Sequence, residues 1–205
     1  DPNRNCDGSH ANKSTSLKNI ALSMLVLFLG MSFQNFTLLD KNIVKVKTSS
    51  IQWKANKVLG SHEGDISLQS GELIYEDGNL VGGNFVMDMT SLICTDLSGE
   101  YKGKLEGHLK SDDFFSVGSH STAELVITNV EQVNSKKHNI TADLTIKGIT
   151  KSITFEANAD KNKFASKIQI DRTQFDVKYG SGSFFEGLGD NMINDEFELT
   201  VIIEI

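Results

Sequence analysis

The sequence has little proline, little cysteine and no excess of positive charge, and each shortage excludes a class of protein. Proline occurs once among 205 residues, which excludes collagen-like and proline-rich structure. Two cysteines, Cys6 and Cys94, are too few for a disulfide framework, and no Cys/His cluster has zinc-site spacing. The formal net charge of -7 argues against a nucleic-acid-binding protein, which usually presents a basic face.

A long hydrophobic run is also missing. Residues 20–31 are apolar except Ser23, and a helix of that length spans roughly 18 Å, too short for a bilayer core of about 30 Å. Basic residues precede this run, so we predict a polar extension plus secretory signal peptide over 1–34. A lead-in over 35–43 and one domain over 44–205 follow, in the periplasm or outside the cell. A buried helix or an uncleaved anchor remains the alternative for the apolar run.

What the chain does contain is alternation of apolar and polar residues. Residues 140–146, 153–157 and 197–205 are examples, and such strands bury one face and leave the other in water. Turn signals separate them, among them Asp77-Gly78. We predict an all-β domain of about eight antiparallel strands. Closing these strands into a barrel would remove exposed edges, although a two-sheet sandwich has the same pattern.

One stretch, residues 95–110, departs from this two-residue period. Its apolar residues recur every four positions, a helical spacing, while glycines at the same spacing weaken any helix. We expect a short helix or an ordered loop crossing one end of the barrel. The apolar residues are Leu97, Tyr101, Leu105 and Leu109, and the glycines are Gly99, Gly103 and Gly107.

No group of residues indicates catalysis or metal binding. His108 and His120 flank Asp112 and Asp113, but the spacing is too loose to make ligands converge, and we interpret them as surface residues. Cys94 has no basic neighbour in sequence, so we interpret it as a small buried hydrophobic residue rather than a reactive thiol.

Four segments resemble segments of a known family, and they occur along the chain in the same order as in that family. They are Ser-Ile-Gln-Trp at 50–53, Leu-Lys-Ser-Asp-Asp-Phe-Phe at 109–115, Leu-Thr-Ile-Lys-Gly-Ile-Thr-Lys at 144–151 and Ile-Asp-Arg-Thr-Gln-Phe at 170–175. Together they resemble the YceI family of bacterial periplasmic proteins, over residues 44–205. That family often has proline after the second and third segments, where this chain has none. The difference falls in loops and concerns the identity of the ligand more than the fold.

The resemblance implies an eight-stranded antiparallel, lipocalin-like β-barrel that binds a long apolar lipid of the polyisoprenoid or isoprenoid-quinone type. It implies storage or transport without catalysis, with no metal and no cofactor besides the lipid. Transient membrane contact is compatible with it, and monomer and homodimer are not distinguished. From alternation and family position, we predict that the cavity is lined by Trp53, Phe85, Met87, Phe114, Phe115, Leu125, Ile127, Leu144, Ile146, Phe155, Ile168 and Phe175.

Two other functions remain open at this stage. A structural or adhesion domain with a packed core would have a cavity of less than about 300 Å³. An enzyme acting on a lipid in the barrel would need polar groups facing the interior, and His62, Asp88 and Asp143 are the candidates. Arg172 is expected to organise its signature segment, with a contact to a ligand head group as the alternative.

Overall fold

A computed structural model describes residues 40–205 of the protein. The predicted signal peptide lies outside this range. None of the helices described there is long and apolar enough to cross a membrane. The strands are β1 (Lys41–Lys45), β2 (Thr48–Lys57), β3 (Gly60–Glu76), β4 (Asn79–Cys94), β5 (Thr122–Asn134), β6 (Lys137–Ile146), β7 (Ile149–Asp160), β8 (Lys163–Asp171) and β9 (Ile193–Glu204). Helix α1 spans Gly99–Lys110, and the 3-10 helices are η1 (Arg172–Phe175) and η2 (Gly189–Asn191).

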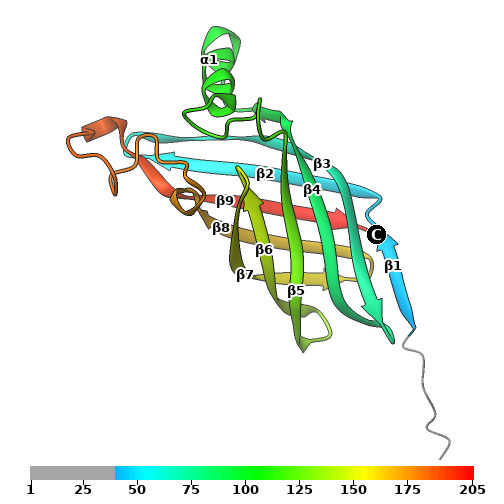
Figure 1. The fold of residues 1–205 in the computed structure, drawn as a ribbon. Helices are drawn as coiled ribbons and strands as arrows, with labels where there is room; N and C mark the ends of the chain where they lie inside the picture. Colours follow the sequence, from blue (N-terminus) through cyan, green and yellow to red (C-terminus); the bar gives the residue numbers. More distant parts are fainter. Residues whose placement is uncertain (1–39) are drawn as a thin grey trace, which may run out of the picture. The chain divides into compact units, whose positions relative to one another are not determined.

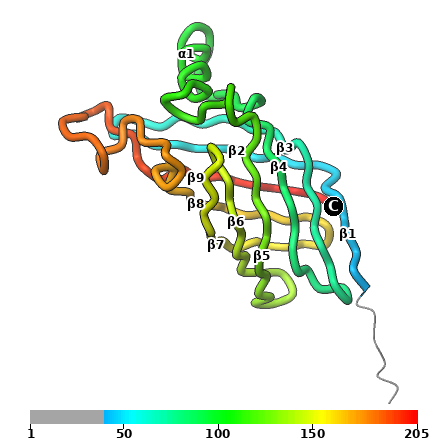
Figure 2. Tube along the Cα trace, in the orientation of Figure 1, coloured from blue at the N-terminus to red at the C-terminus, as the bar shows by residue number. Residues whose placement is uncertain are grey.

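Strands β2 to β9 form one closed antiparallel barrel. Their order around the wall is β3-β2-β9-β8-β7-β6-β5-β4, and pairing of β3 with β4 joins the two ends (Figures 1 and 2). This confirms the predicted eight-stranded all-β barrel. The sandwich interpretation is wrong, because a single sheet closes on itself instead of splitting into two packed sheets.

Strand β1 lies outside this closed set of eight. It pairs with the second half of β3, from Lys41 opposite Glu76 to Lys45 opposite Glu72. The strand begins inside segment 35–43, which the sequence indicated only as a lead-in. Strand β3 is long enough to pair with both β2 and β1 along one edge, because it has 17 residues.

Local sequence explains the hairpins of the barrel wall. In the two-residue turn Asp77-Gly78 the φ values are 49° and 81°, and in the turn Lys147-Gly148 they are 52° and 72°. Positive φ at both central residues matches the right-handed twist of the strands that a hairpin joins. Along β6, buried residues alternate with partly buried ones without exception, which confirms the period of two predicted there.

The segment that departs from that period forms helix α1 at one end of the barrel (Figure 1). Its C-terminal turn packs inward through Leu109, whereas Tyr101 is 74% exposed. Glu106 on the helix accepts a hydrogen bond of 2.8 Å from the backbone N–H of Cys94, and Lys102 donates to the carbonyl of the same residue. These contacts attach the helix to the end of β4.

Arg172 ties the segment after β8 to the start of β9. The side chain is only 2% exposed. Its Nη1 donates to the carbonyl oxygens of Val177 and Tyr179, at 2.7 and 2.9 Å. Its Nε donates to the carbonyl of Asn194 and its Nη2 to that of Ile193, at 3.0 and 3.1 Å. One guanidinium thus supplies the donors for four backbone carbonyls.

Gly64 lets two parts of the wall approach closely. The indole N–H of Trp53 donates to the carbonyl of Ile93, at 3.1 Å, and Gly64 pairs with Trp53 on β2 and Cys94 on β4. A Cβ at residue 64 would lie 1.8 Å from the Ile93 carbonyl oxygen. Only a residue without a side chain fits between these strands.

We expect Arg172→Met to lower the free energy of unfolding by about 3 kcal/mol, because it leaves buried carbonyls without donors. Urea unfolding followed by circular dichroism measures the change. The control is Lys163→Met, which removes an exposed cation 3.9 Å from Glu204 and should cost less than about 0.5 kcal/mol. Equal losses for both variants would contradict the role given to Arg172.

Gly64→Ala is expected to destabilise the barrel by about 3 kcal/mol, because the backbone of two strands must separate to admit the methyl group. Gly103→Ala is the matched control. A Cβ there meets nothing within 4 Å, and alanine in a helix interior is favoured over glycine by about 1 kcal/mol. We therefore expect Gly64→Ala to lower the thermal midpoint and Gly103→Ala to raise it. A shift of both midpoints in the same direction would contradict the close approach of the strands at Gly64.

Candidate functional site

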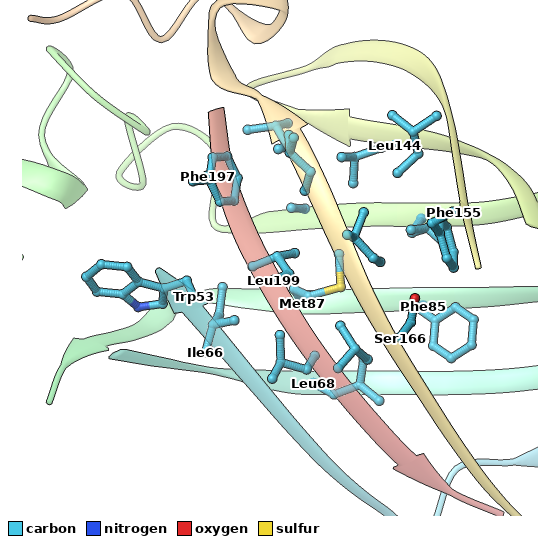
Figure 3. Close-up of a pocket in the computed structure, with 18 of the residues that line it drawn as sticks. Trp53, Ile66, Leu68, Phe85, Met87, Leu144, Phe155, Ser166, Phe197 and Leu199 are labelled. Carbon is cyan, nitrogen blue, oxygen red and sulfur yellow. The ribbon is translucent and has the colours of Figure 1, made fainter. Parts of the chain in front are cut away.

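The barrel encloses an apolar cavity of about 180 Å³. Each of the eight barrel strands contributes to its lining, and the C-terminal end of α1 and the segment after it close one side. All lining residues are apolar except Ser166, Arg172 and Asn194. In Figure 3, Met87 and Leu199 face each other across this space, and Trp53 and Ile66 lie together at one side of it.

The lining follows from strand alternation. On β9, Phe197, Leu199 and Val201 point inward, while Glu198 and Thr200 between them lie outside the lining. The three inward side chains are only partly buried, although they lie inside a closed wall. A packed core would bury them completely, so their residual exposure is the surface of the cavity itself.

Eleven of the twelve residues predicted to line the cavity do so. The exception is Phe175, for which the prediction was wrong. It lies in η1 rather than on a barrel strand, is 1% exposed, and belongs to the hydrophobic core without being among the residues that line the cavity. Those that line it are Trp53, Phe85, Met87, Phe114, Phe115, Leu125, Ile127, Leu144, Ile146, Phe155 and Ile168.

Several lining residues were not predicted. Phe197, Leu199 and Val201 share one face of a strand whose alternation is plain in the sequence, so that signal could have found them. Ile66 and Leu68 had a shorter signal, because they alternate around Ser67 within a strand that is interrupted by irregularities between Asp65 and Ser67 and between Leu68 and Ser70.

The size of the cavity bears on the choice between a carrier and a packed domain. About 180 Å³ is below the roughly 300 Å³ named above as the upper limit for a packed structural domain. By that criterion the volume favours the structural domain, and the cavity holds a long chain only if its lining side chains rearrange. Its walls carry phenylalanine and methionine side chains, and methionine in particular changes rotamer at little cost. The interior of the barrel is therefore neither completely packed nor large enough, as it stands, for a long lipid chain.

Arg172 is the only charged side chain in the lining. Burial lowers the pKa of its guanidinium, and the neighbouring carboxylates of Asp195 and Asp171 offset part of that effect. Its Nη2 lies 3.7 Å from Asp195 Oδ1, and its guanidinium carbon lies 5.6 Å from the Phe114 ring centroid. With its donors engaged by backbone carbonyls, the arginine has a structural role that accounts for its burial.

The three residues considered for catalysis do not line the cavity. His62 Nδ1 lies 2.8 Å from Asp96 Oδ2. A hydrogen bond from the Thr90 hydroxyl lowers the pKa of Asp88. Asp143 lies on β6 between inward-facing Ala142 and Leu144 and is only partly buried.

Asp96 organises a polar cluster at the end of β4. Burial alone would raise its pKa, but hydrogen bonds from the Cys94 thiol, the Glu63 amide and His62 lower it to about 2. The Cys94 Sγ lies 3.0 Å from Asp96 Oδ1 and the thiol is fully buried. Burial raises the pKa of Cys94, which keeps the thiol protonated and unreactive at neutral pH.

Metal-binding residues do not gather in the part of the chain that the structure describes, where no three His, Cys, Asp or Glu side chains are placed to hold an ion. His108 instead packs against aromatic rings, 4.4 Å from Tyr179 and 5.7 Å from Phe114 between centroids.

Comparison with solved structures identifies similar barrels. BcnA of Burkholderia cenocepacia superposes with a TM-score of 0.60 and 18% identity, covering 76% of this chain and 94% of that one. A polyisoprenoid-binding domain from Saccharophagus degradans gives 0.53 and 11% identity, covering 82% and 99%. At these identities the similarity shows the fold alone.

Several sequence relatives carry the name UPF0312 protein. A UPF0312 protein of Vibrio parahaemolyticus is 28% identical over 137 residues, which cover 60% of this chain and 69% of that protein. A UPF0312 protein of Pseudomonas putida is 31% identical over 83 residues, covering 37% and 43%. The model of the YceI-like domain matches residues 43–205, from within β1 to the end of the last strand. The chain therefore belongs to the YceI-like family.

Proposed function

We propose that the barrel binds the apolar chain of a long lipid, of the polyisoprenoid or isoprenoid-quinone type, and stores or transports it without catalysis. The observation that carries this proposal is a space inside a closed barrel that is lined almost entirely by apolar side chains and that those side chains do not fill. A structural neighbour is described as a polyisoprenoid-binding domain, which supports the choice of ligand class.

The energetics of such binding are favourable without strong polar contacts. A chain that buries roughly 600 Å² of apolar surface gains about 15 kcal/mol at 25 cal/mol per Å². Association and ordering of the chain cost about 4 to 15 kcal/mol. The remainder supports useful affinity, and specificity depends on the length and shape of the cavity.

Binding requires the cavity to widen. Phe85, Met87 and Phe155 are lining residues that are only partly buried, so each can change rotamer toward unoccupied space. The barrel wall itself remains paired, and the adaptation is confined to side chains. Location in the periplasm or outside the cell is part of the proposal and rests on the apolar run at residues 20–31.

A cavity-filling substitution separates this function from that of a packed structural domain. Val201 is partly buried in the lining, opposite Ile51 and Ser166. We expect Val201→Phe to weaken binding of geranylgeraniol at least about tenfold while leaving the free energy of unfolding unchanged or higher. In a packed core the same substitution would cost about 1–3 kcal/mol.

The matched control is Thr200→Phe, which adds a ring on the same strand at a residue outside the lining. It should leave binding unchanged. Calorimetric titration and urea unfolding of the same preparations give both quantities. A Val201→Phe protein that is destabilised and that binds as well as the unaltered chain would contradict the proposal.

Native mass spectrometry of protein exported with its own leader tests for the ligand directly. We expect a stoichiometric adduct that solvent extraction identifies as a prenyl or other long-chain lipid. Protein without an adduct that also takes up no added polyprenyl lipid would instead favour a structural domain.

A further inference from the structure

Within the closed barrel, β2 and β3 are paired over only part of their length. The two strands pair from Lys57 opposite Gly60 to Gln52 opposite Asp65, and β1 takes over the same edge of β3 only from Glu72. Among the strands that the structure describes, none pairs with residues 66–70 on this side. The main-chain edges of β2 and β3 therefore face each other here without a ladder between them (Figure 1).

Irregular pairing on the other edge of β3 explains why the strands separate. The register between β3 and β4 shifts between Asp65 and Ser67 and again between Leu68 and Ser70. Shifts of this kind bend a strand and increase its twist. The backbone N–H of Ser67, which pairs with Asp88 in the register, donates to the side-chain hydroxyl of Ser91 at 2.8 Å. Two shifts within six residues turn β3 away from β2.

A groove of about 320 Å³ occupies the gap, and we call it the β2–β3 groove. Its polar lining comes from Ser49, Ser50, Gln52, Asp65 and Ser67. Its apolar lining comes from three residues that also line the main cavity, which are Ile51, Ile66 and Leu68.

The groove and the cavity therefore share a thin wall. In Figure 3, Ile66 and Leu68 point toward the same interior space as Met87 and Leu199. Ile66 and Leu68 are partly buried and lie where the wall has no ladder. No strand pairing joins β2 to residues 66–70 of β3, so a connection between the two spaces would require these side chains to move but no ladder between these strands to break.

The groove has the chemistry of a head-group site for an uncharged molecule. Serine hydroxyls and the Gln52 amide offer donors and acceptors, Asp65 supplies the single charge, and no lysine or arginine is in the lining. A phosphate or diphosphate there would lack a cation and would face a carboxylate, both of which disfavour it. A hydroxyl or a carbonyl could form hydrogen bonds with the serine hydroxyls and the Gln52 amide.

We propose that the β2–β3 groove is the port through which the lipid chain reaches the cavity, and that it holds an uncharged hydroxyl- or carbonyl-bearing head group at the surface. This rests on the proposed function and specifies its ligand as a prenol- or quinone-type amphiphile rather than a prenyl phosphate.

Trp53 provides a reporter for the head-group test, because it is the only tryptophan and lines the cavity beside Ile51. Titrations with geranylgeraniol and geranylgeranyl diphosphate should show tighter binding of the alcohol, by at least about tenfold. Asp65→Lys should reduce this preference about tenfold, because an attraction replaces a repulsion. Asp143→Lys is the control, with the same charge change on the outer face of β6, and should leave the preference unchanged.

The outcomes separate this inference from the function on which it rests. Equal or tighter binding of the diphosphate to the unaltered chain, or equal effects of the two lysine substitutions, would overturn the head-group site while leaving lipid binding intact. Failure of both probes to bind would overturn the proposed function itself.

Access through the groove is tested by blocking it after folding. Ser67→Cys places an exposed thiol in the groove, and Ser152→Cys places one on the outer face of β7. Both variants are made in full-length protein that also carries Cys6→Ser. Cys94 is fully buried and does not compete for the reagent. A bulky maleimide on residue 67 should slow geranylgeraniol association at least about tenfold, and the same adduct on residue 152 should not. Equal association rates for the two adducts would place the port elsewhere.

Discussion

An antiparallel sheet that closes on itself sends alternate side chains of every strand into one enclosed space. In this protein, the pairing of β3 with β4 completes that closure. In a closed barrel, the two-residue period of the sequence determines which side chains line the interior and which side chains face water. The apolar character of the cavity, the polar outer face and the absence of lining carboxylates all follow from that single constraint.

The interior contains both fully buried side chains, as in a packed core, and partly buried side chains around an unfilled space, as in a pocket. Leu73, Ile140 and Leu144 are at most 2% exposed, whereas Phe197, Leu199 and Val201 keep exposed surface within the same barrel. The buried residues hold the wall together, and the partly exposed ones are free to adapt. Gly64 allows the close approach of strands at the edge of this space, and Arg172, the only charged residue in the lining, has its donors engaged by backbone carbonyls.

The sequence predicts the barrel well because its signals are local. Alternation along β6 and β9, and glycine-containing turns such as Asp77-Gly78, depend on neighbouring residues alone. Phe175 was misplaced because its segment forms a 3-10 helix, in which the alternation of a strand no longer assigns a face. The separation of β2 from β3 could not be predicted either, since it depends on register shifts against β4 that no short motif encodes.

The most direct test of the account is a crystal structure of the protein expressed with residues 1–34, together with any ligand that it carries. The account predicts continuous electron density for an apolar chain among Trp53, Met87 and Phe155, with these side chains moved apart to admit it. A core in which the half-buried side chains of β9 close fully onto β2 and β4, and in which no space remains, would contradict it.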